Sequence, residues 1–236
     1  MSATSLADTL DRALTQAREG GATLNESLRL IAASVRARNP AAADAVDRLI
    51  ARLHQAEAGK DAPGPGETMP DFVLPDDSGH LVSLRQLLAG GPLAILFHRG
   101  HWCPYCRMTA SAMSAAAGHI AAAGGRLVSI MPERQGFARA FKRDAHSPFP
   151  VLSDMDNGYA LSLGLVVWVG EEMQRAYSQA GYDLPRYQDN SFWTVPIPAT
   201  FVLDAAGVIV ARHLDPDYRQ RMEVEGLLAA LRAAGR

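Results

Sequence analysis

The chain has 236 residues, of which 48% are hydrophobic and 20% charged, so its composition is that of an ordinary globular protein with one sizeable domain or two small ones. A formal net charge of −2 gives no reason to expect a nucleic acid or an anionic membrane surface as a partner. No apolar run approaches the roughly 20 residues of a membrane span, and the N-terminus has no basic start followed by an apolar core, so we expect a cytoplasmic protein without a secretory signal.

Residues 1–60 are predicted to form a helical extension. Apolar residues recur there at helical spacing in three stretches, Leu6, Leu10 and Leu14, then Leu28, Ile31 and Val35, then Val46, Ile50 and Leu53. We expect these helices to pack on the main domain or on a second subunit rather than to have an activity of their own. The Gly- and Pro-rich stretch 59–66 is typical of a linker, which predicts a main domain at 67–236.

The main domain alternates strand and helix patterns. In chain order we expect strands at 72–74 and 81–84, a helix at 84–88, a strand at 93–97, a helix at 104–123, a strand at 127–131, a helix at 133–144, a strand at 150–152, a helical turn at 159–163, a helix at 171–181, strands at 200–203 and 208–213 and a helix at 224–234. This order predicts an α/β fold with a mixed sheet.

The only two cysteines, Cys103 and Cys106, lie three positions apart where the strand at 93–97 gives way to a helix. Zinc would need two more ligands, and no second such pair exists, so we expect redox chemistry and no metal. A helix N-terminus favours a thiolate, which is the reactive form. Pro104 suits the first turn, with Cys103 exposed at the N-cap and Cys106 more sheltered.

Such a pair can reduce a disulfide or a hydroperoxide. One thiol attacks the substrate, and the other completes the reaction by forming the Cys103–Cys106 bond. We assign the attack to Cys103. The alternative interpretation is that both cysteines are small buried apolar residues.

The run from Trp102 to Cys106 resembles the thioredoxin active site, with a Pro-Tyr dipeptide familiar from glutaredoxins. The surrounding frame resembles the alkyl hydroperoxide reductase/thiol-specific antioxidant family, which contains the peroxiredoxins. The segments that carry this resemblance are Pro70-Asp-Phe-Val-Leu-Pro75, Val82-Ser-Leu84, Phe149-Pro-Val-Leu-Ser-Asp154 and Ala199-Thr-Phe-Val-Leu-Asp204. The resemblance covers 67–234 and implies a thioredoxin-like fold, in which helices flank a mixed central sheet.

The sequence departs from the peroxiredoxin pattern at two places. That family has Pro-x-x-x-Thr/Ser-x-x-Cys around its attacking cysteine, and neither Cys103 nor Cys106 has the proline and hydroxyl at those offsets. Pro198 stands where the family has an arginine, so that Ile197-Pro198 resembles the cis-proline that faces the redox pair in thioredoxins. The family's attacking cysteine usually aligns with the second thioredoxin cysteine, which would reverse the roles of the pair.

Several neighbours are candidates for supporting roles. Arg99 and Arg221 are expected to replace the missing donors, the alternative for each being a solvated surface arginine. Trp102 is expected to shield the thiols or to cover the helix end, and Tyr105 to tune the redox potential or to be merely exposed. His101 is expected either to lower the pKa of Cys103 or to be an exposed loop residue. The tyrosine-containing insertion 168–193 is expected to form a lid or a dimer interface, the alternative being an ordinary insertion packed on the domain.

The leading hypothesis for the function is a peroxiredoxin-like antioxidant enzyme that reduces hydroperoxides through a redox-active disulfide. The alternatives are a general dithiol–disulfide reductase, a redox-responsive binding protein that uses residues 1–60, and a zinc-binding module. Because no nucleotide or flavin motif is present, we expect no cofactor and electrons from thioredoxin, glutaredoxin or glutathione. A homodimer is expected by analogy with related folds.

Overall fold

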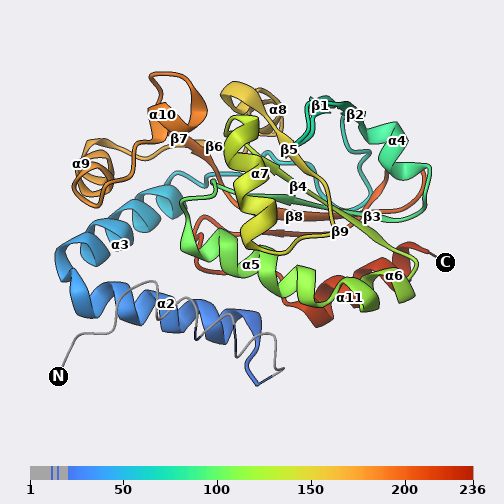
Figure 1. Cartoon of the computed structure of the whole chain (residues 1–236), viewed down its shortest axis with the longest axis horizontal. Coiled ribbons are helices and arrows are strands. Elements are labelled where there is room, and N and C mark those ends of the chain that lie inside the picture. The colour runs from blue at the N-terminus through green and yellow to red at the C-terminus, as the bar shows by residue number, and fades with distance from the viewer. Residues whose placement is uncertain (1–11, 13–14, 16–20, 236) are drawn as a thin grey trace.

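The computed structural model describes residues 12, 15 and 21–235, and Figure 1 shows how its elements are arranged. The first helix predicted from the leucines at 6–14 lies outside the described residues. The next two are present as α2 (Leu24–Arg38) and α3 (Pro40–Gln55). Each begins where the sequence supplies a cap, because the side chain of Thr23 accepts from the Glu26 amide and that of Asn39 from the Ala42 amide.

A five-stranded sheet in the order β5-β4-β3-β8-β9 forms the centre of the molecule. The three parallel strands are β3 (Leu93–Phe97), β4 (Arg126–Met131) and β5 (Val151–Ser153), and the antiparallel ones are β8 (Ala199–Leu203) and β9 (Ile209–Leu214). The mixed sheet confirms the fold class expected from the sequence.

The two faces of the sheet contribute to different hydrophobic cores. Successive side chains of β3 point to opposite faces and so belong alternately to one core and to the other. Ala94 and Leu96 belong to the core on the side of α5 (Pro104–Ala115), α7 (Gln135–Asp144) and α11 (Val224–Ala234), while Leu93 and Ile95 belong to a second core on the opposite side. The second side is covered by the hairpin β1 (Val73–Pro75) and β2 (Leu81–Ser83), by α4 (Leu84–Leu88), by the turn η1 (Met155–Asn157) and by α8 (Gly158–Ser162).

The expected helix at 104–123 is instead two helices, because α5 ends at Ala115 and α6 (Ala117–Ala122) follows. Ala116, between them, has ψ near 5° and is buried. The local sequence is rich in alanine, which favours a continuous helix. The break therefore follows from packing, since α6 lies against α11 and β4.

The insertion forms its own small unit beside α3. A hairpin of β6 (Val166–Trp168) and β7 (Thr194–Pro196) brackets α9 (Glu171–Gln179) and α10 (Leu184–Gln188). Only the helix near α9 was expected. β6, β7 and α10 are each too short to show a period in the sequence, so long-range pairing defines them.

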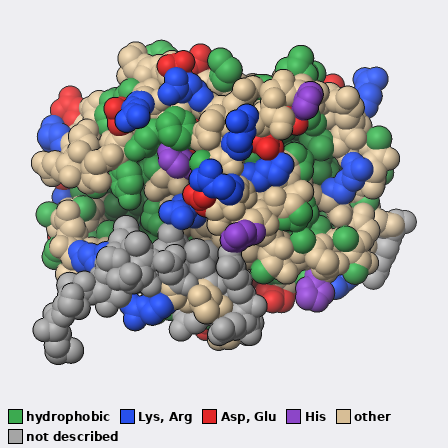
Figure 2. All heavy atoms as spheres, in the orientation of Figure 1, with side chains coloured by type: hydrophobic (Ala, Val, Ile, Leu, Met, Phe, Trp, Pro, Cys, Tyr) green, Lys and Arg blue, Asp and Glu red, His purple; other side chains and the backbone are tan. Residues whose placement is uncertain are grey.

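The surface shown in Figure 2 has basic side chains interspersed with acidic, histidine and apolar ones. Some of the basic and acidic side chains form ion pairs, as on α7, where Lys142 Nζ lies 3.0 Å from Asp77 Oδ1. Within the described residues, no helix has both the length and the apolar character needed to cross a lipid bilayer.

Candidate functional site

The site is built on the loop that leads from β3 into α5. The His98 amide still donates to the Ile130 carbonyl of β4 at 2.8 Å, after which the chain leaves the sheet and Cys103 becomes the N-cap of α5. Gly100 is needed in this loop because its φ is +148° and a Cβ there would lie 2.5 Å from Trp102 Nε1. Pro104 follows at the first turn of the helix, as predicted.

A buried carboxylate fixes the loop from the neighbouring strand end. Glu133, just after β4, accepts from the His101 amide at 2.7 Å and pairs with the His101 Nδ1 at 2.8 Å. Burial raises the pKa of Glu133, and the hydrogen bonds from His101 offset part of this shift. The His101 ring also stacks on Phe137, with 4.6 Å between ring centroids. His101 is thus a partner of Glu133 and not a free loop residue.

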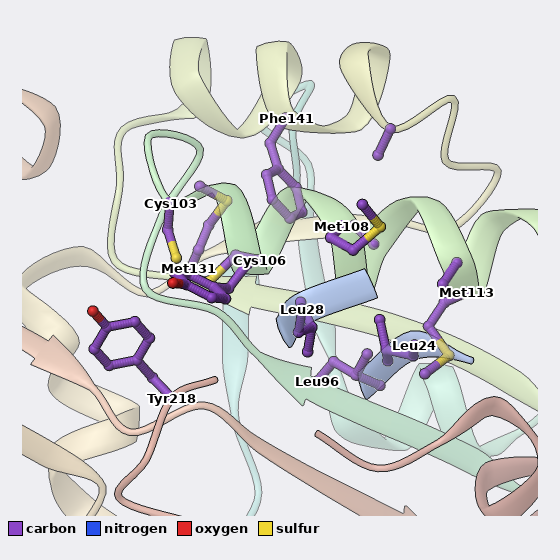
Figure 3. Packing of buried hydrophobic residues seen from close by; sticks show 14 of the residues in the cluster. Leu24, Leu28, Leu96, Cys103, Cys106, Met108, Met113, Met131, Phe141 and Tyr218 are labelled. Atoms are coloured by element: carbon purple, nitrogen blue, oxygen red, sulfur yellow. The ribbon is translucent and has the colours of Figure 1, made fainter. Parts of the chain in front are cut away.

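Both cysteines are reduced and buried, with exposed fractions of 1% for Cys103 and 0% for Cys106. The expectation that Cys103 is exposed is therefore wrong, because aromatic side chains from distant segments cover the helix end. Figure 3 shows the two sulfur atoms facing one another at the start of α5, with Met131 beside them.

The two thiols share one negative charge. Burial raises the pKa of Cys106, but the neighbouring Cys103 thiol, the His98 ring and the charge of Arg221 outweigh burial, so this pKa lies well below that of an ordinary thiol. The Arg99 amide also donates to Cys106 Sγ at 3.4 Å. Burial, together with its hydrogen bond to Cys106 and the negative charge there, raises the pKa of Cys103. Cys103 thus keeps the proton and Cys106 carries the charge.

Two buried arginines lie beside this charge. The Arg99 guanidinium donates to the Tyr177 hydroxyl and lies 3.9 Å from the Tyr218 ring centroid and 5.0 Å from that of Trp102. Arg221 is 5% exposed, and its Nε and Nη2 have no hydrogen-bond partner. Among the described residues no carboxylate forms an ion pair with either guanidinium, so both positive charges act on the cysteine pair without a competing carboxylate.

A largely apolar cavity of about 380 Å³ opens onto Cys103. Its floor contains Arg99, Trp102, Pro104 and Tyr105, and its walls come from α2, α3 and α9. Cys106 is not among the residues that line it. A small molecule that enters the cavity therefore meets the sulfur of Cys103 first.

Most of the residues singled out from the sequence meet here. The cavity is lined by Arg99, Trp102, Cys103, Pro104 and Tyr105. Cys106 and Arg221 do not line it, but the charge of Arg221 lowers the pKa of Cys106 behind Cys103. The surface-arginine alternative is wrong for Arg99 and Arg221, and Tyr105 is buried rather than exposed. The insertion packs over the site, because Tyr177 and Tyr182 contact the Trp102 ring at centroid distances of 5.1 and 5.4 Å.

The cis-proline expected at Ile197-Pro198 is wrong in this structure, since the described residues contain no cis peptide bond. The Ile197 amide donates to the Leu165 carbonyl at 2.7 Å and continues the pairing of β7 up to the start of β8. A trans bond maintains this extended course. Pro198 is buried but is not among the residues that line the cavity.

Three further residues of the site were not found by sequence reasoning. His98 is buried, with Nε2 3.1 Å from Ser129 Oγ, and its Nδ1 has no hydrogen-bond partner. Glu133 and Tyr218 complete the set. The position of His98 directly after a buried strand was an available signal, whereas Tyr218 lies in a loop with no local pattern.

Comparisons with known proteins agree with this geometry. The sequence profile of the AhpC/TSA family matches residues 65–212, more than half of the chain. Chloroplastic peroxiredoxin Q of Sedum lineare is 27% identical over 144 residues, which are 61% of this chain and 65% of that protein. For chloroplastic peroxiredoxin Q of Populus jackii the identity is also 27%, over 57% of that protein. The match thus spans less than two thirds of these relatives' length.

Solved structures show the same fold. Peroxidoxin BcpB of Mycobacterium tuberculosis has a TM-score of 0.56 at 23% identity and covers 72% of this chain and 97% of its own. The bacterioferritin comigratory protein of Xanthomonas campestris has a TM-score of 0.54 at 17% identity, covering 74% and 98%. These likenesses confirm the expected thioredoxin-like fold. The profile match over more than half of the chain shows that it belongs to the AhpC/TSA family.

Proposed function

We propose that this protein is a thiol-dependent peroxidase that reduces hydroperoxides with Cys103 and Cys106. The observation that carries the proposal is a buried pair of free cysteines beside two buried guanidinium groups, at the closed end of a cavity. Peroxide cleavage develops negative charge on the leaving oxygen, and fixed positive groups in a buried site stabilise that charge. Arg99 and Arg221 are proposed to provide them.

The proposed reaction begins with proton transfer from Cys103 to the neighbouring sulfur of Cys106. The Cys103 thiolate attacks the terminal oxygen of ROOH, the O–O bond breaks, and the leaving alkoxide takes the proton back from Cys106 to give ROH. The Cys106 thiolate then attacks the sulfenic acid on Cys103, which forms the disulfide and releases hydroxide. One dithiol monoanion and one ROOH thus give one disulfide, one ROH and one OH⁻.

The alternative of a general disulfide reductase is disfavoured by burial. A protein disulfide must approach the attacking sulfur in line, and Cys103 is 1% exposed. A hydroperoxide can instead pass through the cavity. The bacterioferritin comigratory protein of Xanthomonas campestris is described as reducing alkyl peroxides, which supports the same assignment here. A thiol reductant such as thioredoxin, glutaredoxin or glutathione, a cytoplasmic location and a homodimer remain parts of the proposal.

The test is stopped-flow oxidation of the fully reduced protein by hydrogen peroxide, followed by intrinsic tryptophan fluorescence, which Trp102 beside Cys103 should make sensitive to the oxidation. We expect a second-order rate constant at least about a hundredfold above that of a free thiol, because positioned acid–base and electrostatic groups contribute at least that much. A rate equal to that of free cysteine would show that the site does not activate peroxide.

Two serine variants assign the roles within the pair. Cys103→Ser is expected to abolish the fast phase, whereas Cys106→Ser is expected to leave a sulfenic acid on Cys103 that a dimedone label traps. Mass spectrometry of the labelled peptide distinguishes the residues. If the label instead appears on Cys106 in the Cys103→Ser variant, the attacking residue is Cys106.

A further inference from the structure

The Arg99 side chain is enclosed by aromatic rings from three separate parts of the chain. Its guanidinium carbon lies 3.9 Å from the ring centroid of Tyr218, 5.0 Å from that of Trp102 and 5.6 Å from that of Tyr177. Ring faces attract a positive charge. This attraction depends little on how the guanidinium is turned within its own plane, so the rings alone do not fix the directions of its N–H donors.

The hydroxyl of Tyr177 supplies the missing direction. Arg99 Nη2 donates a hydrogen bond to this oxygen, and both residues are buried. The N–H donors of a guanidinium lie in one rigid plane, so a hydrogen bond at Nη2 also sets the directions of the others. Since Arg99 lines the cavity that opens onto Cys103, the Tyr177 hydroxyl determines which donors Arg99 presents there.

Tyr177 is itself held in place by its helix and by α3. It lies on the buried side of α9, and the start of that helix is tied to α3 at two points. Arg52 donates to the Trp168 carbonyl at 2.9 Å, and Arg48 forms an ion pair of 2.6 Å with Glu172. A tyrosine has few side-chain torsions, so a packed ring on a fixed helix also fixes the position of its hydroxyl.

We propose that Tyr177 is a positioning residue for Arg99, whose guanidinium it holds with the positive charge directed at Cys103. Tyr177 takes no part in bond making, because it acts only through the arginine. The insertion thereby contributes to the site a group that the Cys-Pro-Tyr-Cys segment does not contain. This inference rests on the proposed peroxidase function and adds to it the residue that orients one of its two arginines.

The orientation matters because negative charge forms at a fixed place. It forms on Cys103 when the thiol loses its proton, and then on the leaving oxygen when the O–O bond breaks. Burial raises the pKa of Cys103, whereas the charge of Arg99 lowers it. A guanidinium that is already in position stabilises such charge without the cost of reorganisation. Without the hydroxyl the group can turn within its plane, and part of this stabilisation is lost.

Tyr177→Phe removes the hydroxyl and keeps the ring. We expect the rate constant for oxidation of the reduced protein by hydrogen peroxide to fall about tenfold, within the roughly hundredfold loss that a small misplacement of a positioned group can cause. Tyr187→Phe is the matched control. Tyr187 belongs to the same insertion and contacts the His101 ring, but it does not line the cavity, so this variant should keep the wild-type rate constant.

A double-mutant cycle separates positioning from a general effect on the fold. Arg99→Met removes the guanidinium, after which the Tyr177 hydroxyl has nothing to orient. Tyr177→Phe should therefore slow oxidation about tenfold in the wild-type background and have no further effect in the Arg99→Met background. Equal losses in the two backgrounds would show that Tyr177 acts through the packing of the site, which would overturn the inference.

Alkylation of Cys103 by iodoacetamide gives a readout that involves no peroxide. Cys106, Arg99 and Arg221 are charged or titratable groups that act on the pKa of Cys103, and Cys106→Ser removes the first of them. In the Cys106→Ser background, Tyr177→Phe should move the pH midpoint of alkylation upward, because a misdirected guanidinium stabilises the thiolate less. Tyr187→Phe should leave the midpoint in place. A midpoint that Tyr177→Phe does not move contradicts the inference.

The two proposals fail separately. Fast oxidation of the wild type that Tyr177→Phe leaves unchanged overturns the positioning role and leaves the peroxidase function standing. Oxidation of the wild type at the rate of a free thiol overturns the peroxidase function, and the alkylation midpoint then decides by itself whether Tyr177 orients Arg99.

Discussion

At the scale of single residues, the site depends on where one negative charge resides. A helix N-terminus stabilises a thiolate in general, but the particular partners decide which of two sulfurs holds it. The Arg99 amide, His98 and Arg221 stabilise a thiolate on Cys106. On Cys103, burial and the negative charge of Cys106 disfavour a thiolate. The more accessible sulfur therefore keeps its proton until substrate arrives.

The lowered pKa of Cys106 predicts a pH profile. Reduced protein should show thiolate ultraviolet absorbance at neutral pH that disappears in a one-proton step well below the ordinary pKa of a thiol. Because the folded-state pKa is depressed, the thiolate stabilises the reduced fold above the unfolded-state pKa, and this contribution is lost as the pH falls through the lowered value. Arg221→Gln should move the step to higher pH.

The control for this profile is Arg232→Gln on the exposed side of α11, which should leave the step in place. Cys106→Ser should remove the step altogether. If the step remains at the same pH in Cys106→Ser, the charge belongs to Cys103 and the order of the two pKa values is the reverse.

At the scale of elements, α2 holds the segment that contains Arg221. The Asn25 side chain donates to the Arg221 carbonyl at 2.9 Å and accepts from the Arg221 amide at 3.0 Å. Glu223 accepts from the amides of Leu24 and Asn25 at 2.9 and 3.0 Å, where a carboxylate also complements the helix dipole. Helix α2 and the segment that contains the buried Arg221 are thus joined by hydrogen bonds across the fold.

Asn25→Ala tests this connection. We expect the free energy of unfolding in urea to fall by about 1–3 kcal/mol, because the variant leaves a partly buried carbonyl and amide without partners. The Arg221 backbone is then less well fixed, so oxidation by hydrogen peroxide should also slow. Arg29→Ala, on the exposed face of the same helix, should change neither quantity. Unchanged oxidation in Asn25→Ala would show that Arg221 needs no support from α2.

At the scale of the whole molecule, the N-terminal helices share a core with the domain they precede. Leu28 and Ile31 of α2 and Leu49 of α3 belong to the same buried cluster as Met108 and Met113 of α5. Figure 3 shows Leu24 and Leu28 near the labelled residues of α5. The boundary expected at 59–66 stays a prediction, and this shared core argues against two independently stable parts.

Deletion of residues 1–60 tests the boundary. We expect the shortened chain to unfold at a lower urea concentration and to aggregate, because the apolar side of α5 loses its cover. The full chain should unfold in one transition when followed by both fluorescence and circular dichroism. A shortened chain that unfolds at the same midpoint would establish 67–236 as an autonomous domain.

Local patterns in the sequence sufficed for most of the fold. Signals that depend on neighbouring residues alone predicted the strand β3, the helices α2, α3 and α11, and the start of α5 at the Cys-Pro-Tyr-Cys segment. The structure contains each of these elements. The proposed thiol chemistry also rests on the sequence, because two cysteines at this spacing favour a redox pair.

The tertiary structure decided how that chemistry is enclosed. Tyr177 and Tyr218 reach Arg99 from positions 78 and more residues away, and α2 and α3 close the cavity over Cys103. Contacts of this kind leave no period or motif in the chain, since they depend on which surfaces meet when the helices pack. The sequence by itself therefore determined the cysteine pair and its helix, and only the folded structure determined the burial of Cys103, the groups around Cys106 and the cavity that opens onto the pair.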